Sequence, residues 1–212
     1  MKRITLLLSL FLIFCGLNAQ FSSSPLAPTL LAGGAGEQVI PKIAIGNDGN
    51  MYLGRFDSVN GSYDVWLQYL DSSGNLLWQN PRGILVSSFP QMTWLTEWDL
   101  DVDLTGNCWL TFQDIRTAGV NNVMLYKVDT GGNILLSNTG IALSYDTSTD
   151  YINMSPVLLC HSSGDVYVAW QRSALTTEIH LQRISPAGEL LWGTNGITFA
   201  GDAVSFTWPQ LL

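Results

Sequence analysis

Short stretches in which neighbouring positions are both apolar recur along the chain. Residues 51–56, 108–113 and 166–171 read Met-Tyr-Leu-Gly-Arg-Phe, Cys-Trp-Leu-Thr-Phe-Gln and Val-Tyr-Val-Ala-Trp-Gln. Successive side chains of a β-strand point to opposite faces, so both faces of these stretches carry apolar groups and both need a cover. The pattern therefore predicts strands that are packed between two other layers.

These stretches belong to a longer repeat. A Gly followed by Asn or Asp stands just before each one, at Gly49, Gly106 and Gly164, so the copies are 57 and 58 residues apart. Each period is predicted to hold four strands. The first strands are residues 41–45, 98–102 and 156–160, the third strands are 65–70, 123–128 and 179–184, and the fourth run through 76–78, 134–136 and 190–192. A period of this size is typical of the four-stranded blade of a β-propeller.

The turns between the predicted strands account for many acidic residues. In Asp71-Ser-Ser-Gly-Asn75 and Asp129-Thr-Gly-Gly-Asn133, a short carboxylate stands at the turn entry and a glycine stands where φ is expected to be positive. Ser185-Pro-Ala-Gly-Glu189 does the same with a hydroxyl. We interpret these side chains as turn acceptors rather than catalytic groups.

One motif allows a family resemblance to be stated. The stretch Asp64-Val-Trp-Leu-Gln-Tyr-Leu-Asp-Ser-Ser-Gly-Asn-Leu-Leu-Trp78 returns at residues 122–136 and 178–192. It resembles the β-propeller repeats of secreted bacterial proteins of the Bacteroidota type, and is similar to SBBP-like propeller repeats. The resemblance covers residues 41–212 and implies the fold only, because such repeats share no catalytic residues.

We therefore expect an all-β, β-propeller-like array of about three four-stranded blades. The expected blades are residues 41–97, 98–155 and 156–208, and a fourth is expected to start at 209. Closed propellers have at least four blades. The expectation is an incomplete propeller within a longer protein, with apolar blade faces open at both ends.

The first residues predict export. Met1-Lys2-Arg3 is followed by a short apolar run and then by Ala19, which fits a signal peptide over residues 1–19 and a secreted or cell-surface location. The alternative is lipidation at Cys15, which the bulky Phe14 before it disfavours. Residues 20–40 are interpreted as a loop or a stray outer strand, and no span is expected in the mature chain.

The net charge excludes one class of partner, and the cysteines allow two interpretations. The formal net charge is −8, and cleavage would leave seven basic residues against seventeen acidic ones. Such a chain repels phosphate backbones, so no nucleic acid partner is expected. Cys108 and Cys160 are interpreted as buried thiols because the other repeats carry apolar residues at their positions, although an exported chain also permits a disulfide.

One acidic cluster is a candidate metal site. Alternate spacing puts Asp99, Asp101 and Asp103 on one face of an extended segment, close to Glu97. Ca²⁺ prefers such oxygen ligands, whereas the other repeats are not acidic there, which favours a solvated strand edge. No other cofactor is expected.

Aromatic residues outside the repeat pattern are candidate ligand contacts for an unknown protein or carbohydrate. They are Trp66, Trp94, Trp98 and Trp208. The two histidines, His161 and His180, stand at repeat positions, so no catalytic residue is assigned. The favoured function is a non-catalytic binding or scaffold module. The alternatives are a propeller hydrolase or lyase acting on extracellular polysaccharide, and a calcium-dependent adhesion module.

Overall fold

The computed structural model describes residues 31, 36–59, 62–91, 97–201 and 204–212. These residues form thirteen strands and no helix, so none of them belongs to a helix able to cross a membrane. The predicted all-β class is confirmed. The predicted signal peptide, residues 1–19, lies outside the described residues.

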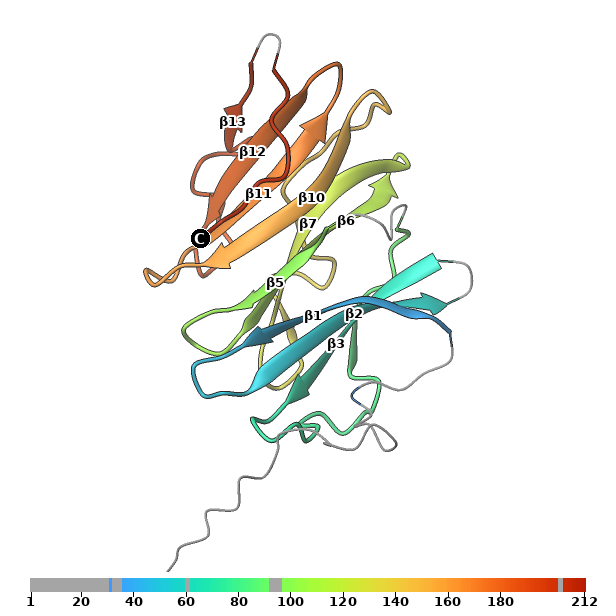
Figure 1. Cartoon of the computed structure of the whole chain (residues 1–212), viewed down its shortest axis with the longest axis vertical. Coiled ribbons are helices and arrows are strands. Elements are labelled where there is room, and N and C mark those ends of the chain that lie inside the picture. Colours follow the sequence, from blue (N-terminus) through green and yellow to red (C-terminus); the bar gives the residue numbers. More distant parts are fainter. Residues whose placement is uncertain (1–30, 32–35, 60–61, 92–96, 202–203) are drawn as a thin grey trace, which may run out of the picture.

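The strands form three antiparallel sheets that follow one another along the chain (Figure 1). The first sheet contains β1 (Gln38–Ile45), β2 (Met51–Val59), β3 (Ser62–Leu70) and β4 (Ile84–Ser87) in that order. The second sheet contains β5 (Asp99–Val102), β6 (Cys108–Thr117), β7 (Val120–Val128) and β8 (Ile134–Leu135), with β9 (Ile141–Ala142) also paired to β7. The third sheet contains β10 (Ile152–Cys160), β11 (Val166–Ser173), β12 (Thr177–Ile184) and β13 (Ile197–Phe199).

The pairing register confirms the alignment of the three repeats. The first and second strands of each sheet meet at matching positions, with the pairs Ala44 and Tyr52, Asp101 and Trp109, and Leu159 and Tyr167. Turns between these strands use positive-φ glycines at Gly49, Gly106 and Gly164. A residue in one sheet therefore has a definite counterpart in the other two.

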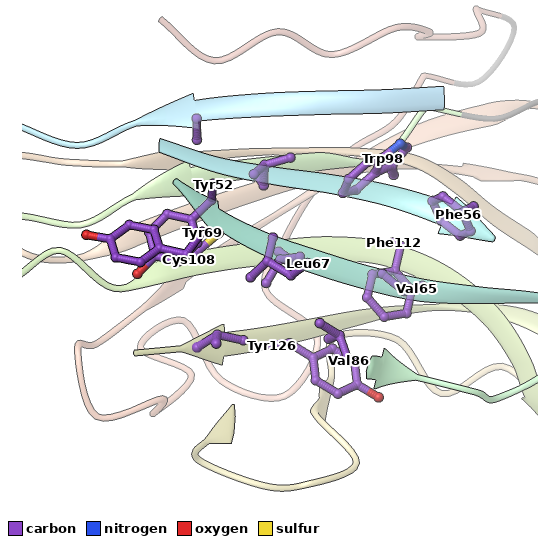
Figure 2. Packing of buried hydrophobic residues seen from close by; sticks show 14 of the residues in the cluster. Tyr52, Phe56, Val65, Leu67, Tyr69, Val86, Trp98, Cys108, Phe112 and Tyr126 are labelled. Carbon is purple, nitrogen blue, oxygen red and sulfur yellow. The ribbon is translucent and has the colours of Figure 1, made fainter. Parts of the chain in front are cut away.

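The sheets pack face to face, with the second between the first and the third. The strand β5 contacts both β1 and β10. One apolar cluster joins the first two sheets, and Figure 2 shows Phe56 and Leu67 of the first sheet beside Phe112 and Tyr126 of the second. Another cluster joins the second and third sheets. As the sequence pattern predicts, the second sheet is covered on both sides, and every residue of β7 is buried.

Side-chain donors fix each sheet to the turns of the next. Tyr52 Oη donates to the carbonyl of Gly106 at 2.8 Å, and Trp78 Nε1 donates to the carbonyl of Thr130 at 2.9 Å. From the second sheet, Lys127 Nζ donates to the carbonyl of Pro186 at 3.0 Å. Pro186 occupies the same turn position as Thr130. The second sheet is therefore fixed to the third through the same turn carbonyl that fixes the first sheet to the second.

The prediction for the fourth strands is wrong in the first and third repeats. Residues 76–78 and 190–192 contribute only isolated bridges, and the outer strands β4 and β13 begin after Gly83 and Gly196 instead. Gly83 has a φ of 81°, and a Cβ there would lie 2.0 Å from the carbonyl oxygen of Leu67. Glycine is thus needed for the chain to return to β3. Residues 209–212, expected to open a fourth period, form no strand.

Candidate functional site

The predicted metal ligands Asp99 and Asp101 instead join two sheets. Both side chains reach from β5 to the open edge of β10. Asp99 Oδ2 accepts a hydrogen bond from the backbone N–H of Leu158 at 3.1 Å, and Asp101 Oδ2 accepts one from Cys160 at 2.9 Å. Burial raises the pKa of Asp99, although the Leu158 amide and Lys42 oppose the rise. These carboxylates serve the packing of the sheets.

The other two members of the acidic cluster are also engaged. Glu97 pairs with Lys42 at 3.1 Å, and Lys42 lies 3.7 Å from Asp99. Asp103 closes its turn: burial disfavours its ionised form, but hydrogen bonds from Thr105, Trp109 and Asn107 outweigh burial and lower its pKa to about 2. Among the described residues, no group of three or more His, Cys, Asp or Glu side chains is arranged to hold a metal ion.

The predicted aromatic contacts do not converge on one place. Trp98 is a core residue rather than a ligand contact, since it is 1% exposed and its Nε1 donates to the carbonyl of Ile40 at 2.9 Å. Trp66 is half-buried on β3, beneath the Arg82 guanidinium at 4.1 Å. Trp208 is 66% exposed beyond the third sheet. Trp94 lies outside the described residues.

A polar cavity of about 470 Å³ lies where the segment after β9 meets the third sheet. Its volume is in the range of small-molecule sites. The segment 143–146 forms one wall, and β10 to β13 form the rest. The polar lining residues are Ser144, Tyr145, Asp146, Asn153, Arg172, Glu178, His180, Asn195 and Thr198, above Leu143 and Trp170.

Charged groups within the cavity are tied to one another. Arg172 donates to both oxygens of Asp146, at 3.0 Å from Nε and 2.9 Å from Nη2, and its Nη1 lies 3.5 Å from Glu178. The Arg172 hydrogen bond is the largest influence on Asp146 and lowers the pKa of that carboxyl, with a further contribution from Asn153. Asp146 is therefore held ionised as an acceptor.

His180 links the cavity floor to its rim. Its ring stacks on Trp170 with the centroids 5.4 Å apart. Its Nε2 lies 3.2 Å from Glu178, and its Nδ1 lies 3.3 Å from Thr198 Oγ1. The ring is consequently fixed in place, and Glu178 is shared between His180 and Arg172.

Comparison with the other sheets shows what is particular to this cavity. The first sheet carries an ion pair of Arg55 and Asp57, and the second carries one of Arg116 and Asp114, both with fully buried carboxylates. The third sheet differs: Arg172 stands at the register position of Asp57 and Asp114, and its partner Asp146 comes from the segment before β10. This pair keeps 23% of the Arg172 side chain and 19% of the Asp146 side chain exposed. The Asp146 carboxylate is thus more exposed to solvent than the carboxylates of Asp57 and Asp114.

Sequence reasoning missed this site for a physical reason. Glu178 and His180 alternate along β12, and Arg172 pairs with Glu178 across the hairpin, so a hairpin register could have placed these three together. Tyr145 and Asp146 lie in an irregular segment before β10, where no periodicity fixes the direction of a side chain.

No family model matches the chain, and no similar curated protein is found. Among solved structures, an endo-arabinase from Bacteroides thetaiotaomicron is similar at 14% sequence identity, with a TM-score of 0.42. The match covers 71% of this chain and 61% of the arabinase chain, so this chain spans less than two thirds of that enzyme. Similarity at this level supports no conclusion about fold or activity.

Proposed function

We propose that this chain is an exported β-propeller segment that binds a neutral, polyhydroxylated ligand, such as a sugar unit of a glycan. The proposed binding site is the cavity beside the third sheet. Export rests on the signal-peptide pattern of residues 1–19. The propeller assignment is supported by three repeated antiparallel sheets that pack face to face with their first strands adjacent.

The lining of the cavity carries the proposal. Asp146 and Glu178 provide acceptors, whereas Arg172 and Asn195 provide donors, so a hydroxyl that both donates and accepts is matched. Two carboxylates stand against one guanidinium, which disfavours an anionic ligand. Tyr145, 68% exposed, offers a ring at the rim for a sugar face.

The cavity favours binding over hydrolysis. Hydrolysis of a glycosidic bond requires one carboxyl with a raised pKa as the acid and a second carboxylate as the base or nucleophile. The pKa of Asp146 is lowered by Arg172 instead. Glu178 is shared between Arg172 and His180. Both carboxylates are thus engaged as hydrogen-bond acceptors.

Titration calorimetry with a panel of neutral oligosaccharides tests the proposal. We expect Tyr145→Ala and Glu178→Gln each to weaken binding about tenfold or more, equivalent to about 1.4 kcal/mol. Trp208→Ala is the matched control, because Trp208 is as exposed as Tyr145 but lies outside the cavity. The control should bind like the wild type. Binding of none of the panel, or binding lost in Trp208→Ala alone, would contradict the proposal.

The same panel separates binding from the hydrolase alternative. Incubation of each oligosaccharide with the wild-type chain should release no new reducing ends. Release that disappears in Glu178→Gln while binding persists would assign the cavity to hydrolysis instead.

A further inference from the structure

The third sheet carries an apolar face that no other sheet covers among the residues that the structure describes. This outer face, on the side away from the second sheet, includes Tyr167, Ile179, Leu181 and Phe199. By register, Ile179 and Leu181 are the counterparts of Val65 and Leu67 in the first sheet and of Val123 and Leu125 in the second. Those four counterparts are fully buried between sheets, at 0% exposure. In the third sheet, Ile179 and Leu181 are half-buried and Phe199 is 51% exposed.

The outer face also repeats the donors that fix one sheet to the next. Tyr167 and Trp192 lie with ring centroids 5.8 Å apart, and their counterparts Tyr52 and Trp78 lie 6.0 Å apart. Tyr52 and Trp78 donate to turn carbonyls of the second sheet. Among the described residues, none accepts a hydrogen bond from Tyr167 Oη or Trp192 Nε1. The outer face is therefore equipped to dock onto two turns of a further sheet.

The first sheet presents the matching surface. Its turns place the carbonyls of Gly49 and Ser72 at the positions of Gly106 and Thr130, the acceptors used in the second sheet. No described residue donates to either carbonyl. The exposed side chains Ile43 and Ile45, at 51% and 65%, hold the positions that Leu100 and Val102 occupy in the core between the first two sheets. The neighbouring residues of this face, Met51, Leu53 and Leu70, are already buried in a cluster with Leu31 and Leu76, so the second copy would contact the face mainly at Ile43, Ile45 and the two turns.

These two surfaces lie on opposite sides of the second sheet, so one molecule cannot join them to each other (Figure 1). We propose that two copies of this chain associate head to tail, with the outer face of the third sheet of each against the first sheet of the other. Such a heterologous contact gives a closed ring when each copy uses both of its surfaces. The described strands of two copies would contribute six sheets to the ring, which is within the four to eight blades of closed propellers.

Two further features affect the proposed contact between the copies, namely the charged residues near it and the C-terminal segment, residues 206–211. Arg183, which is opposite Tyr167 in the sheet and already forms an ion pair with Asp165, would lie near the turns of the first sheet that carry Asp48 and Asp71. Residues 206–211 cover part of the outer face, leaving a groove of about 490 Å³. This segment is attached by few bonds, including Phe206 N–H to the carbonyl of Thr177 at 2.9 Å, so the second copy displaces it.

Sedimentation velocity over a concentration series tests the inference. The wild type is expected to form a dimer. Ile45→Asp on the first sheet and Phe199→Asp on the third should each raise the dissociation constant at least tenfold, and both sites are exposed enough for the monomer to fold. Leu175→Asp is the control, because Leu175 is fully exposed in the β11–β12 hairpin, away from both surfaces, and should dimerise normally.

Mixing the two weakened variants distinguishes head-to-tail association from a symmetric contact. Ile45→Asp retains an intact third sheet and Phe199→Asp retains an intact first sheet, so the mixture should form a mixed dimer that neither variant forms alone. A monomeric wild type at about 100 μM, dimers that survive both substitutions, or a mixture that remains monomeric would each overturn the proposal. So would loss of the dimer when residues 205–212 are removed, since their removal should strengthen it.

Discussion

Replacing Asp101 by alanine measures how strongly the second and third sheets are held together at their first strands. Asp101 Oδ2 accepts a hydrogen bond from the Cys160 N–H at 2.9 Å. Within the described part of the chain, β10 pairs with β11 alone, so this amide lies on an open edge with the carboxylate as its partner. A hydrogen bond to a charged group contributes about 1.5–3 kcal/mol. Asp101 is half-buried, so we expect the free energy of unfolding to fall by about 2 kcal/mol.

Urea denaturation at pH 7, followed by tryptophan fluorescence, provides the measurement. Asp101→Asn should lose about half as much as the alanine variant, since an amide oxygen still accepts a neutral hydrogen bond. Asp150→Ala is the control, because Asp150 is exposed and bonds only to Ser148; it should change stability by less than about 0.5 kcal/mol. An Asp101→Ala variant as stable as this control would refute the role assigned to the carboxylate.

Three further predictions follow from buried charge, turn carboxylates and glycine geometry. Asp57→Ala leaves the buried Arg55 guanidinium without its carboxylate, although the Arg82 carbonyl still accepts from it, and should lower the free energy of unfolding by about 3–5 kcal/mol in urea denaturation. Because the folded-state pKa of Asp103 is lowered to about 2, its stabilisation is present above about pH 4 and is lost as the pH falls toward 2; Asp103→Ala should reduce the acid dependence of the melting temperature in that window. Gly83→Ala would bring its Cβ to 2.0 Å from the Leu67 carbonyl and should cost more than about 2 kcal/mol of the unfolding free energy, so a wild-type melting temperature would contradict the stated need for glycine.

The repeat made most of the fold predictable. Three copies of one register fix the first three strands of each sheet, and apolar residues on both faces of β6 predict that the second sheet is covered on both sides. The fourth strands were misplaced because apolar residues such as Leu76 and Trp78 suggest a strand. In the structure Trp78 packs between the first two sheets and Leu76 packs against the outer face of the first sheet, whereas Gly83 decides where pairing with β3 resumes.

The candidate site was less predictable because its residues depend on tertiary packing. Asp99 and Asp101 look like metal ligands in a single strand, but the N–H groups that they bind lie 59 residues further along the chain. The sequence suggests that Trp98 is available to a ligand, whereas in the structure its indole N–H donates to the carbonyl of Ile40. Asp146 lies in a segment without hydrophobic periodicity, so the local sequence pattern could not predict its contact with Arg172.

Hydrogen–deuterium exchange with and without the tightest-binding oligosaccharide tests the proposed binding site most directly. We expect added protection in peptides that cover residues 143–146 and the β11–β12 hairpin, with little change in β3 or in residues 204–212. Protection confined to β3, which carries Trp66, or to the segment that carries Trp208 would contradict it and return the binding site to the aromatic residues outside the cavity.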